Sequence, residues 1–121
     1  MDSLYQEELL SRYKKPLYKG KMESPVLCGV GNNPLCGDKI ELDLEVKHGK
    51  IVDARFSGAG CAISQVATDM LCEKIIGMEL KKAKNISLDE LEEMLGVPLS
   101  SARKKCAFLG LQVLKELKGT K

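Results

Sequence analysis

Apolar and polar residues form three strand-like patterns in the first half of the chain. In residues 40–46 (IELDLEV), apolar side chains occupy every second position and acidic side chains fill the positions between them. This period of two is typical of a strand with one buried face and one face in water. Residues 51–56 repeat the period, so we expect Val52, Ala54 and Phe56 on the same face. The apolar run 26–30 predicts a third strand.

Apolar residues at helical spacing predict four helices around these strands. The first covers residues 2–14, and the second covers residues 62–76, which a glycine follows. A capping box that begins at Ser87 opens a short helix that ends at residue 95. A last helix runs from about residue 101 to residue 117. Its apolar stripe consists of Ala102, Cys106, Leu109, Val113 and Leu117.

The order of these elements predicts the fold class. One helix precedes three consecutive strands, and the remaining helices follow them. Short turns between the strands favour an antiparallel arrangement, so we expect an α+β fold in which a three-stranded antiparallel β-meander packs against helices. The length of 121 residues suits a single domain, residues 1–121.

Composition narrows the class of protein. The chain has 19 basic and 17 acidic residues, and its net charge of +2 does not favour binding to nucleic acid. The longest apolar runs fall far short of the ~20 residues that span a membrane. The first residues carry no pattern of a secretory signal. We therefore expect a cytoplasmic protein that binds neither nucleic acid nor membrane.

The five cysteines are expected to be reduced thiols, because no secretory signal accompanies them. The only histidine, His48, lies in the segment Lys47-His48-Gly49-Lys50, which predicts a turn between two strands. Any metal site must then be built from sulfur and oxygen ligands.

Cys36 and Asp38 lie two residues apart in the segment PLCGD. We expect a turn at the start of a strand, where Gly37 gives the backbone room to bend and lets both side chains converge. An exposed, incidental thiol is the alternative interpretation of Cys36, and an ordinary residue at a strand start is the alternative for Asp38.

Cys61 ends the segment SGAGC and directly precedes the predicted helix 62–76. Unpaired backbone N–H groups and the macrodipole at a helix N-terminus favour a thiolate there. The two glycines, Gly58 and Gly60, either let a metal or cluster approach the backbone or mark a tight turn from strand to helix.

Cys106 lies on the apolar stripe of the last helix, where a buried, inert cysteine is common. Arg103, three residues earlier on nearly the same face, and the adjacent Lys105 supply positive charge that stabilises a thiolate. Cys106 is therefore either a core residue or a reactive thiol. Cys28 and Cys72 lie within a predicted strand and a predicted helix, and we interpret both as structural.

The sequence contains no closely spaced cysteine pair (CxxC) of the kind that zinc fingers and ferredoxins use. The candidate ligands come instead from three distant segments: Cys36, Asp38, Cys61 and Cys106. If the fold gathers them, three sulfur atoms and one oxygen form a pocket for a thiophilic metal or an iron–sulfur cluster.

Three segments resemble the U-type iron–sulfur cluster assembly scaffolds, the family of IscU, SufU and the N-terminal domain of NifU. They are residues 33–38 (NPLCGD), 56–64 (FSGAGCAIS) and 103–107 (RKKCA). The first twenty residues also look like the N-terminal segment of the family, so the resemblance covers nearly the whole chain. It implies an IscU/SufU-like fold, in agreement with the α+β prediction.

The resemblance implies a scaffold protein, not an enzyme. Such a scaffold accepts sulfur from a cysteine desulfurase, takes up iron, assembles a [2Fe–2S] cluster and transfers it to apo iron–sulfur proteins, as a monomer or a homodimer. The family's ligands fall on Cys36, Asp38, Cys61 and Cys106. Cys36 and Cys106 are the candidate sulfur acceptors, because a loop position and cationic neighbours favour a reactive thiolate. Arg103 and Lys105 are candidate accessory residues.

Lys105 stands where many housekeeping members of the family carry a histidine. In this respect the chain resembles the SufU branch, whose members commonly hold zinc and relay sulfur. SufU proteins usually have an insertion before the last helix, however, and residues 87–98 leave little room for one. Two alternatives therefore stand beside the scaffold. One is a zinc-bound, SufU-like sulfurtransferase that relays persulfide sulfur through the same four residues. The other is a small interaction domain with ordinary cysteines.

Overall fold

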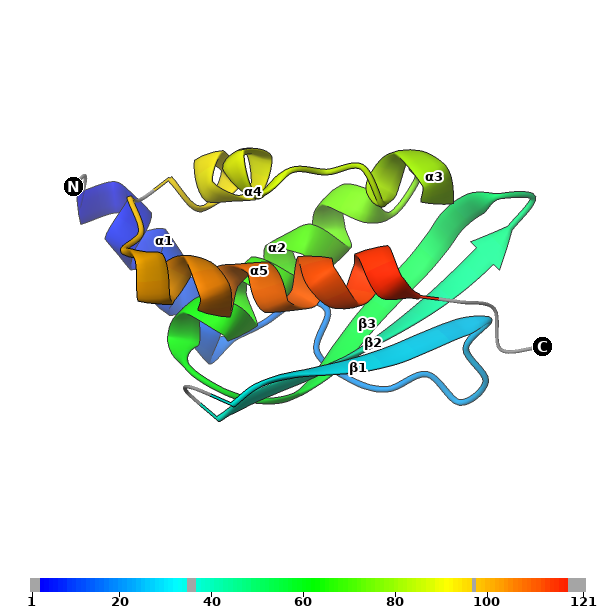
Figure 1. The fold of residues 1–121 in the computed structure, drawn as a ribbon, viewed down its shortest axis with the longest axis horizontal. Coiled ribbons are helices and arrows are strands. Elements are labelled where there is room, and N and C mark those ends of the chain that lie inside the picture. Colours follow the sequence, from blue (N-terminus) through cyan, green and yellow to red (C-terminus); the bar gives the residue numbers. More distant parts are fainter. Residues whose placement is uncertain (1–2, 35–36, 97, 118–121) are drawn as a thin grey trace.

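Three strands form a single antiparallel sheet in the computed structural model, which describes residues 3–34, 37–96 and 98–117. The strands pair in the order β1-β2-β3 (Figure 1). They are β1 (Leu27–Asn33), β2 (Asp38–Lys47) and β3 (Lys50–Ala59). The predicted antiparallel meander is therefore confirmed, and His48 lies in its second turn, as predicted.

Five helices accompany the sheet in the described part of the chain, and two of them cover one of its faces. They are α1 (Ser3–Lys14), α2 (Ala62–Ile75), α3 (Leu80–Ala83), α4 (Leu88–Leu95) and α5 (Ser101–Glu116). α2 and α5 pack against each other and against the strands, so the predicted α+β layering is confirmed (Figure 1). Ser87 and Ser100 begin α4 and α5, because each hydroxyl accepts a hydrogen bond from a backbone N–H of the first turn. None of these described helices has the length and apolar character needed to cross a bilayer.

The hydrophobic core lies between the sheet and helices α2 and α5. Ile40, Leu42 and Leu44 alternate along β2 and are fully buried. They belong to one cluster with Phe56 of β3 and Leu71 of α2. The period of two that predicts β2 therefore marks the face that the helices cover.

A β-bulge changes the orientation of side chains at the start of β3. The register between β2 and β3 shifts at Glu45 and Val46, which leaves Val52 without a partner in that pairing. The extra residue reverses the alternation, so Ile51 is fully buried whereas Val52 is 45% exposed. The prediction that Val52 shares a face with Ala54 and Phe56 is therefore wrong, because those two residues are fully buried.

Three further details differ from the sequence predictions. β1 continues to Asn33, because residues 31–33 pair with residues 38–40 of β2. Glycine at position 31 also leaves room for α5, since a Cβ there would meet Val113 Cγ2 at 2.6 Å. The sequence does not predict α3, since four residues are too short to show a period. Ala102, predicted on the buried stripe of α5, is exposed because it lies in the first turn of that helix, outside the core.

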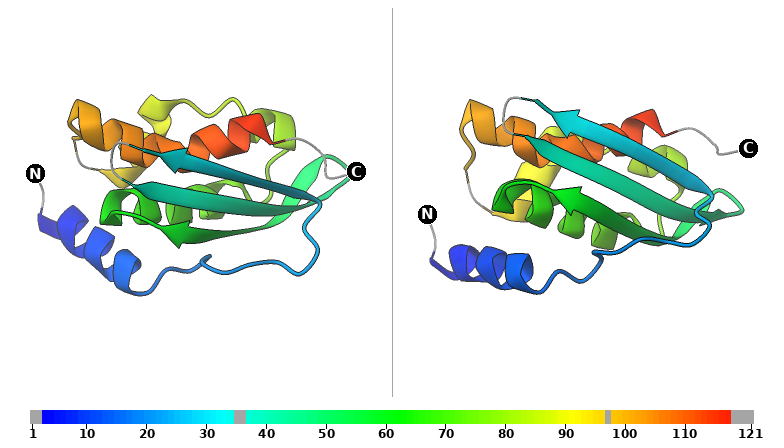
Figure 2. Two further views of the ribbon diagram at one scale, coloured as in Figure 1. Left: turned by 60° about the horizontal axis from the view of Figure 1, so that its bottom comes forward. Right: turned by 90° about the horizontal axis from the view of Figure 1, so that it is seen from below.

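The segment between α1 and β1 runs along the free edge of β3 before it reaches β1 (Figure 2). The Phe56 N–H donates to Tyr18 O at 3.0 Å, and the Gly20 N–H donates to Phe56 O at 2.7 Å. Arg12 of α1 forms an ion pair with Asp69 of α2. The N-terminal part of the chain is thus attached to both the sheet and the helix layer.

Candidate metal centre

Asp38 lies at the first position of β2, where it is 1% exposed. Its Oδ1 accepts a hydrogen bond from the backbone N–H of Cys61 at 2.9 Å. That N–H belongs to the start of α2, where backbone donors lack partners within the helix and carry partial positive charge. The helix start therefore compensates part of the negative charge of the buried carboxylate.

Cys61 is the N-cap residue of α2 and has an extended backbone, with φ −71° and ψ 165°. Its side chain makes no capping hydrogen bond. The thiol instead donates toward Asp38 Oδ2, with Sγ at 3.7 Å from that oxygen. Because Cys61 is only half-buried, its sulfur is the more accessible one in the described part of the site.

Cys106 brings a second sulfur from α5 to the same place and is 5% exposed. One donor atom from each of Asp38, Cys61 and Cys106 lies within 4.8 Å of the other two. In Figure 1, the start of β2, the loop before α2 and the first half of α5 meet at the same end of the molecule. Three segments that are distant in sequence therefore supply donor atoms close enough to bind one metal ion.

The fourth predicted ligand, Cys36, lies outside the described residues, two positions before Asp38 in the sequence. Its role stays a prediction. The described donors, one carboxylate oxygen and two sulfurs, are ligands that zinc and iron both accept.

The two glycines before α2 have different roles. Gly58 of β3 has a φ of 127°, and a Cβ there would clash with the backbone carbonyl of Lys39 on β2, so this strand position requires glycine. A Cβ at Gly60 would instead lie 2.5 Å from Asp38 Oδ1. Gly60 therefore makes room for the carboxylate of the site, whereas Gly58 allows the close pairing of β3 with β2.

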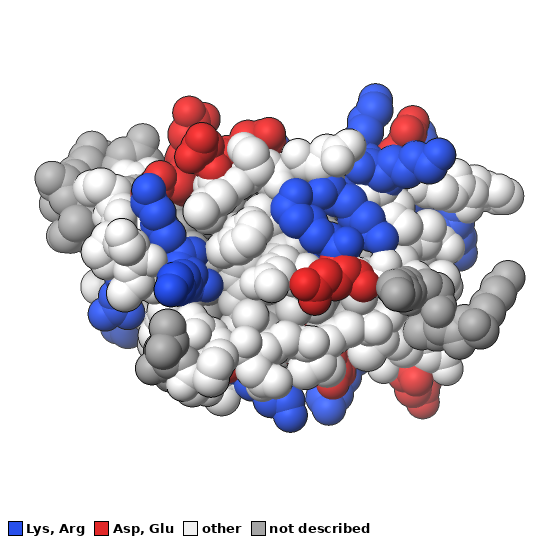
Figure 3. All heavy atoms as spheres, viewed as in Figure 1, with Lys and Arg blue, Asp and Glu red and all other residues white. Residues whose placement is uncertain are grey.

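The two predicted accessory cations lie on the surface of α5 near the site. Arg103 and Lys105 are exposed. Lys105 lines a hollow of about 260 Å³ together with Asn33 and Phe108, between the end of β1 and α5. Figure 3 shows basic side chains near the start of α5 and acidic side chains over α4. The effect of these cations on the Cys106 thiol stays a prediction.

The two cysteines predicted to be structural differ from each other. Cys72 is fully buried in α2. Burial, and then the charge of nearby Asp69, raise the pKa of its thiol well above the usual value, so it is an inert core residue. Cys28 is exposed on β1, so it does not belong to the core. Desolvation and the neighbouring Asp43 carboxylate raise the pKa of the Cys28 thiol to about 11.

Cys28 belongs to a second cluster of possible ligands, which it forms with Glu41 and Asp43. Sequence spacing does not reveal this cluster, because Cys28 and Asp43 become neighbours only through the pairing of β1 with β2. The available signal is the pair of acidic residues on the outward face of β2, which by itself is typical of a solvated strand.

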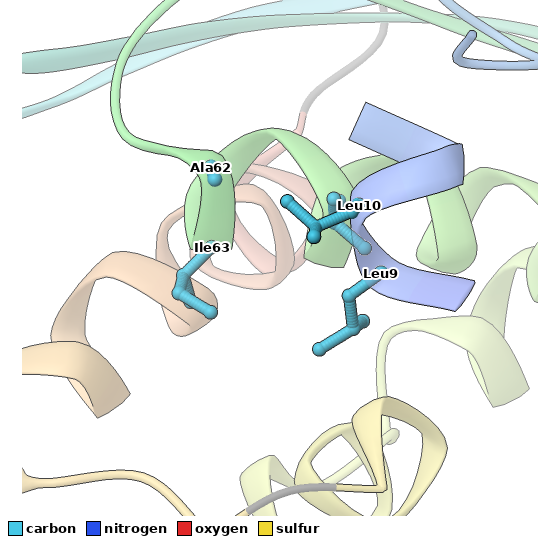
Figure 4. A pocket seen from close by; sticks show the side chains of 5 residues that line it. Leu9, Leu10, Ala62 and Ile63 are labelled. Atoms are coloured by element: carbon cyan, nitrogen blue, oxygen red, sulfur yellow. The ribbon is translucent and has the colours of Figure 1, made fainter. Parts of the chain in front are cut away.

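An apolar groove of about 290 Å³ opens between α1 and the start of α2 (Figure 4). Its lining residues are Leu9, Leu10, Ala62, Ile63 and Val66. Leu10 is 56% exposed. Because Ala62 directly follows Cys61, an apolar surface borders the cluster of donor atoms on this side.

A protein-family model described as the NifU-like N terminal domain matches residues 4–117. The chain belongs to this family. The three sequence motifs that contain Cys36, Cys61 and Cys106 all lie within the matched residues, and the resemblance inferred from those motifs is confirmed.

Relatives in the NifU-like family match along nearly the whole chain. The zinc-dependent sulfurtransferase SufU of Bacillus subtilis is 30% identical, and the match covers 96% of this chain and 90% of the relative. The iron–sulfur cluster assembly scaffold protein IscU of Thermotoga maritima is 32% identical, and the match covers 93% of this chain and 91% of that protein. A crystal structure from Fervidobacterium islandicum AW-1 is described as a candidate scaffold protein for the SUF system. It matches this chain with a TM-score of 0.79 at 29% identity, and the match covers 93% of this chain and 95% of that one. The expected IscU/SufU-like fold is therefore confirmed.

Proposed function

We propose that this protein is a scaffold for iron–sulfur cluster assembly. The observation that carries the proposal is the gathering of donor atoms from Asp38, Cys61 and Cys106 in a member of the NifU-like family. A relative of similar length is named an iron–sulfur cluster assembly scaffold. In this proposal Cys36 completes the ligand set, and the four residues hold a [2Fe–2S] cluster while it is built.

The mixed ligand set suits a cluster that the protein holds only until it is transferred. Thiolates bind iron and support bridging sulfide. Asp38 offers a harder oxygen donor, which holds iron less tightly than a fourth cysteine would. The weakest ligand exchanges first, so such a cluster is released more readily to an apo-protein than one with four cysteines.

Sulfur is proposed to arrive as a persulfide on a cysteine desulfurase. A thiolate of this chain attacks the outer sulfur of the persulfide, the sulfur–sulfur bond of the donor breaks, and the donor cysteine leaves as a thiolate. Reduction of the transferred sulfur to sulfide requires electrons from an external reductant. Cys36 and Cys106 are the proposed acceptors, and transfer to Cys106 requires the site to open because this residue is 5% exposed.

The proposed partners are therefore a cysteine desulfurase and the apo iron–sulfur proteins that receive the cluster. The proposed compartment is the cytoplasm, where thiols stay reduced. A monomer and a homodimer both accommodate this chemistry, because the described donors lie within one chain.

Anaerobic reconstitution with ferrous iron and sulfide tests the scaffold proposal. We expect visible absorption and about two irons per cluster. Cys61→Ser and Cys106→Ser are each expected to abolish most of this absorption, because each removes one sulfur ligand. Cys72→Ala is the matched control, since it changes a buried cysteine outside the site. Colourless native protein, or equal absorption from native protein and the ligand variants, contradicts the proposal.

A zinc-dependent sulfurtransferase is the second candidate function. It is favoured by the name of the relative SufU and by the donor set, because tetrahedral zinc binds cysteine and aspartate. Alignment length does not separate the candidates. The matches to SufU and to the Thermotoga scaffold span 133 and 130 positions, more than the 121 residues of this chain, so both relatives contain residues without a counterpart here.

Metal content and sulfur loading distinguish the two functions. A sulfurtransferase is expected to contain zinc as purified and to accumulate persulfide on one cysteine after incubation with a desulfurase and cysteine. A scaffold is expected to convert that sulfur into a cluster when iron and a reductant are added. Elemental analysis and mass spectrometry of protein purified without oxygen make the distinction.

A further inference from the structure

We propose that Cys28, Glu41 and Asp43 form a second metal site on the outer face of the sheet, for a divalent cation that accepts both sulfur and oxygen, such as Zn²⁺. One donor atom from each residue lies within 4.8 Å of the other two. The position of Asp43 along β2 places this cluster about 17 Å from Asp38, at about 3.4 Å per residue. The proposal does not depend on the scaffold function.

The register of β1 and β2 creates the cluster. Cys28 is the direct partner of Asp43 in the antiparallel pair. Glu41 lies two residues before Asp43, on the same face of β2. Directly opposed residues have Cβ atoms about 4.5–5.5 Å apart, which lets both side chains reach one ion. This face points away from α5, since Gly29, the neighbour of Cys28 on β1, lies against that helix.

Asp43 gives an independent indication that a cation belongs here. Asp43 is 3% exposed and lies on the face of the sheet opposite the helices. Oδ2 accepts a hydrogen bond from the Met22 N–H at 3.1 Å. Oδ1 is buried and has no hydrogen-bond partner within the described residues. A buried carboxylate oxygen without a partner is costly, and a cation bound beside it removes that cost.

The basic residues around the cluster leave its charge largely uncompensated. Lys21 lies 4.0 Å from Glu41 Oε2, but the Lys21 side chain is 70% exposed. Such an exposed pair stabilises little. Arg55 is the partner of Asp43 on β3, yet its guanidinium pairs with Asp53 at 2.9 Å. A metal ion would supply the positive charge that these side chains do not deliver to Asp43.

The donor types indicate which ions fit. Zinc binds cysteine sulfur and carboxylate oxygen together, and water completes a tetrahedral shell around three protein ligands. As the metal–sulfur bond forms, the proton of the Cys28 thiol passes to solvent. β1 is an edge strand, so an ion held between β1 and β2 is expected to stabilise that edge.

A titration of the full chain with Zn²⁺, in competition with a chromophoric chelator, tests the proposal. We expect Cys28→Ser and Asp43→Asn each to bind about one ion fewer than the native chain. Glu45→Gln is the matched control, because Glu45 lies on the same face of β2 but outside the cluster. It is expected to bind as many ions as the native chain.

Two measurements keep the test decisive. In ¹¹³Cd NMR spectra of the native chain, one resonance is expected to disappear in Cys28→Ser and to persist in Cys61→Ser, so a failure of the site at Asp38 does not affect the outcome. Far-UV circular dichroism identifies variants that fail to fold. Unchanged stoichiometry in folded Cys28→Ser and Asp43→Asn, or a cadmium spectrum that Cys28→Ser leaves unchanged, overturns the proposal.

Discussion

Gly60 matters through the side chain that it lacks. The Asp38 carboxylate occupies the space that a Cβ at this position would take. The same carboxylate accepts a hydrogen bond from the Cys61 N–H and lies beside the Cys61 sulfur. A methyl group at position 60 would therefore displace one ligand of the proposed site without altering any sulfur.

Gly60→Ala is expected to weaken metal binding by about 10- to 100-fold, the range seen when residues that position a metal ligand are changed. The added Cβ pushes Asp38 away from Cys61, while the backbone at position 60 needs no positive φ and tolerates alanine. Chelator competition measures the affinity. Ala59→Ser, at the exposed neighbouring position, is the control and should bind as the native chain does. Equal affinity for both variants would show that Gly60 does not shape the site.

Single residues show which parts of the site can be predicted from sequence. Asp38, Cys61 and Cys106 stand out because each has a local signal, such as a turn glycine, a helix start or neighbouring cations. Their convergence is not encoded in spacing, and the family resemblance supplies it. The Cys28 cluster carries no such signal, because it depends on the register that brings Asp43 opposite Cys28.

At the scale of elements, the contact between α2 and α5 sets the distance between the sulfur atoms of Cys61 and Cys106. Cys61 begins α2, and Cys106 lies one turn before Gly110 on α5. A Cβ at Gly110 would lie 2.5 Å from Thr68 Oγ1 of α2. The absence of a side chain at Gly110 therefore lets the helices approach closely enough to bring the sulfurs together.

Gly110→Ala is expected to cost about 1 kcal/mol of unfolding free energy. Overpacking against Thr68 costs about 1–3 kcal/mol, and alanine returns up to about 1 kcal/mol of helix propensity. Metal affinity is expected to fall as well, because the helices separate near Cys106. Urea unfolding and chelator competition measure the two effects.

Thr68→Ala in the Gly110→Ala background provides the control for this contact. Removal of the Thr68 hydroxyl and methyl groups takes away the two nearest of the three atoms that the new Cβ would meet and leaves the Thr68 Cβ at 3.2 Å. The double variant is therefore expected to be more stable than the sum of the single effects predicts, by about 0.5 kcal/mol or more. Strict additivity would place the cost of Gly110→Ala elsewhere.

Elements with a clear period are predictable, and those set by tertiary contacts are not. The period of two predicts β2, and the capping box that begins at Ser87 predicts the start of α4. The bulge at Val52 has no local signal, since two apolar residues in succession fit either register. β1 reaches Asn33 because residues 31–33 pair with β2, and the polar and glycine residues there give no strand period.

At the scale of the whole molecule, the N-terminal part of the chain ties the two layers together. Residues 18–20 pair with β3. The Tyr18 N–H also donates to Asp69 Oδ1 at 2.7 Å, and Arg12 pairs with the other oxygen of this fully buried carboxylate. Burial lowers the pKa of Arg12, but hydrogen bonds with Asp69 and Glu73 outweigh this effect and raise it, so Arg12 stays charged.

Arg12→Leu is expected to lower the unfolding free energy by about 3 kcal/mol, because it leaves the Asp69 carboxylate buried without its cation. Glu73→Gln is the matched control. It removes the other, 52% exposed partner of Arg12 and should cost at most about 1 kcal/mol. Urea unfolding gives both values. Metal binding by folded Arg12→Leu should stay native, because β2, α2 and α5 position the donors. Similar losses of unfolding free energy in the two variants would show that Asp69 does not need Arg12. A loss of metal affinity in folded Arg12→Leu would show that the N-terminal segment also shapes the site.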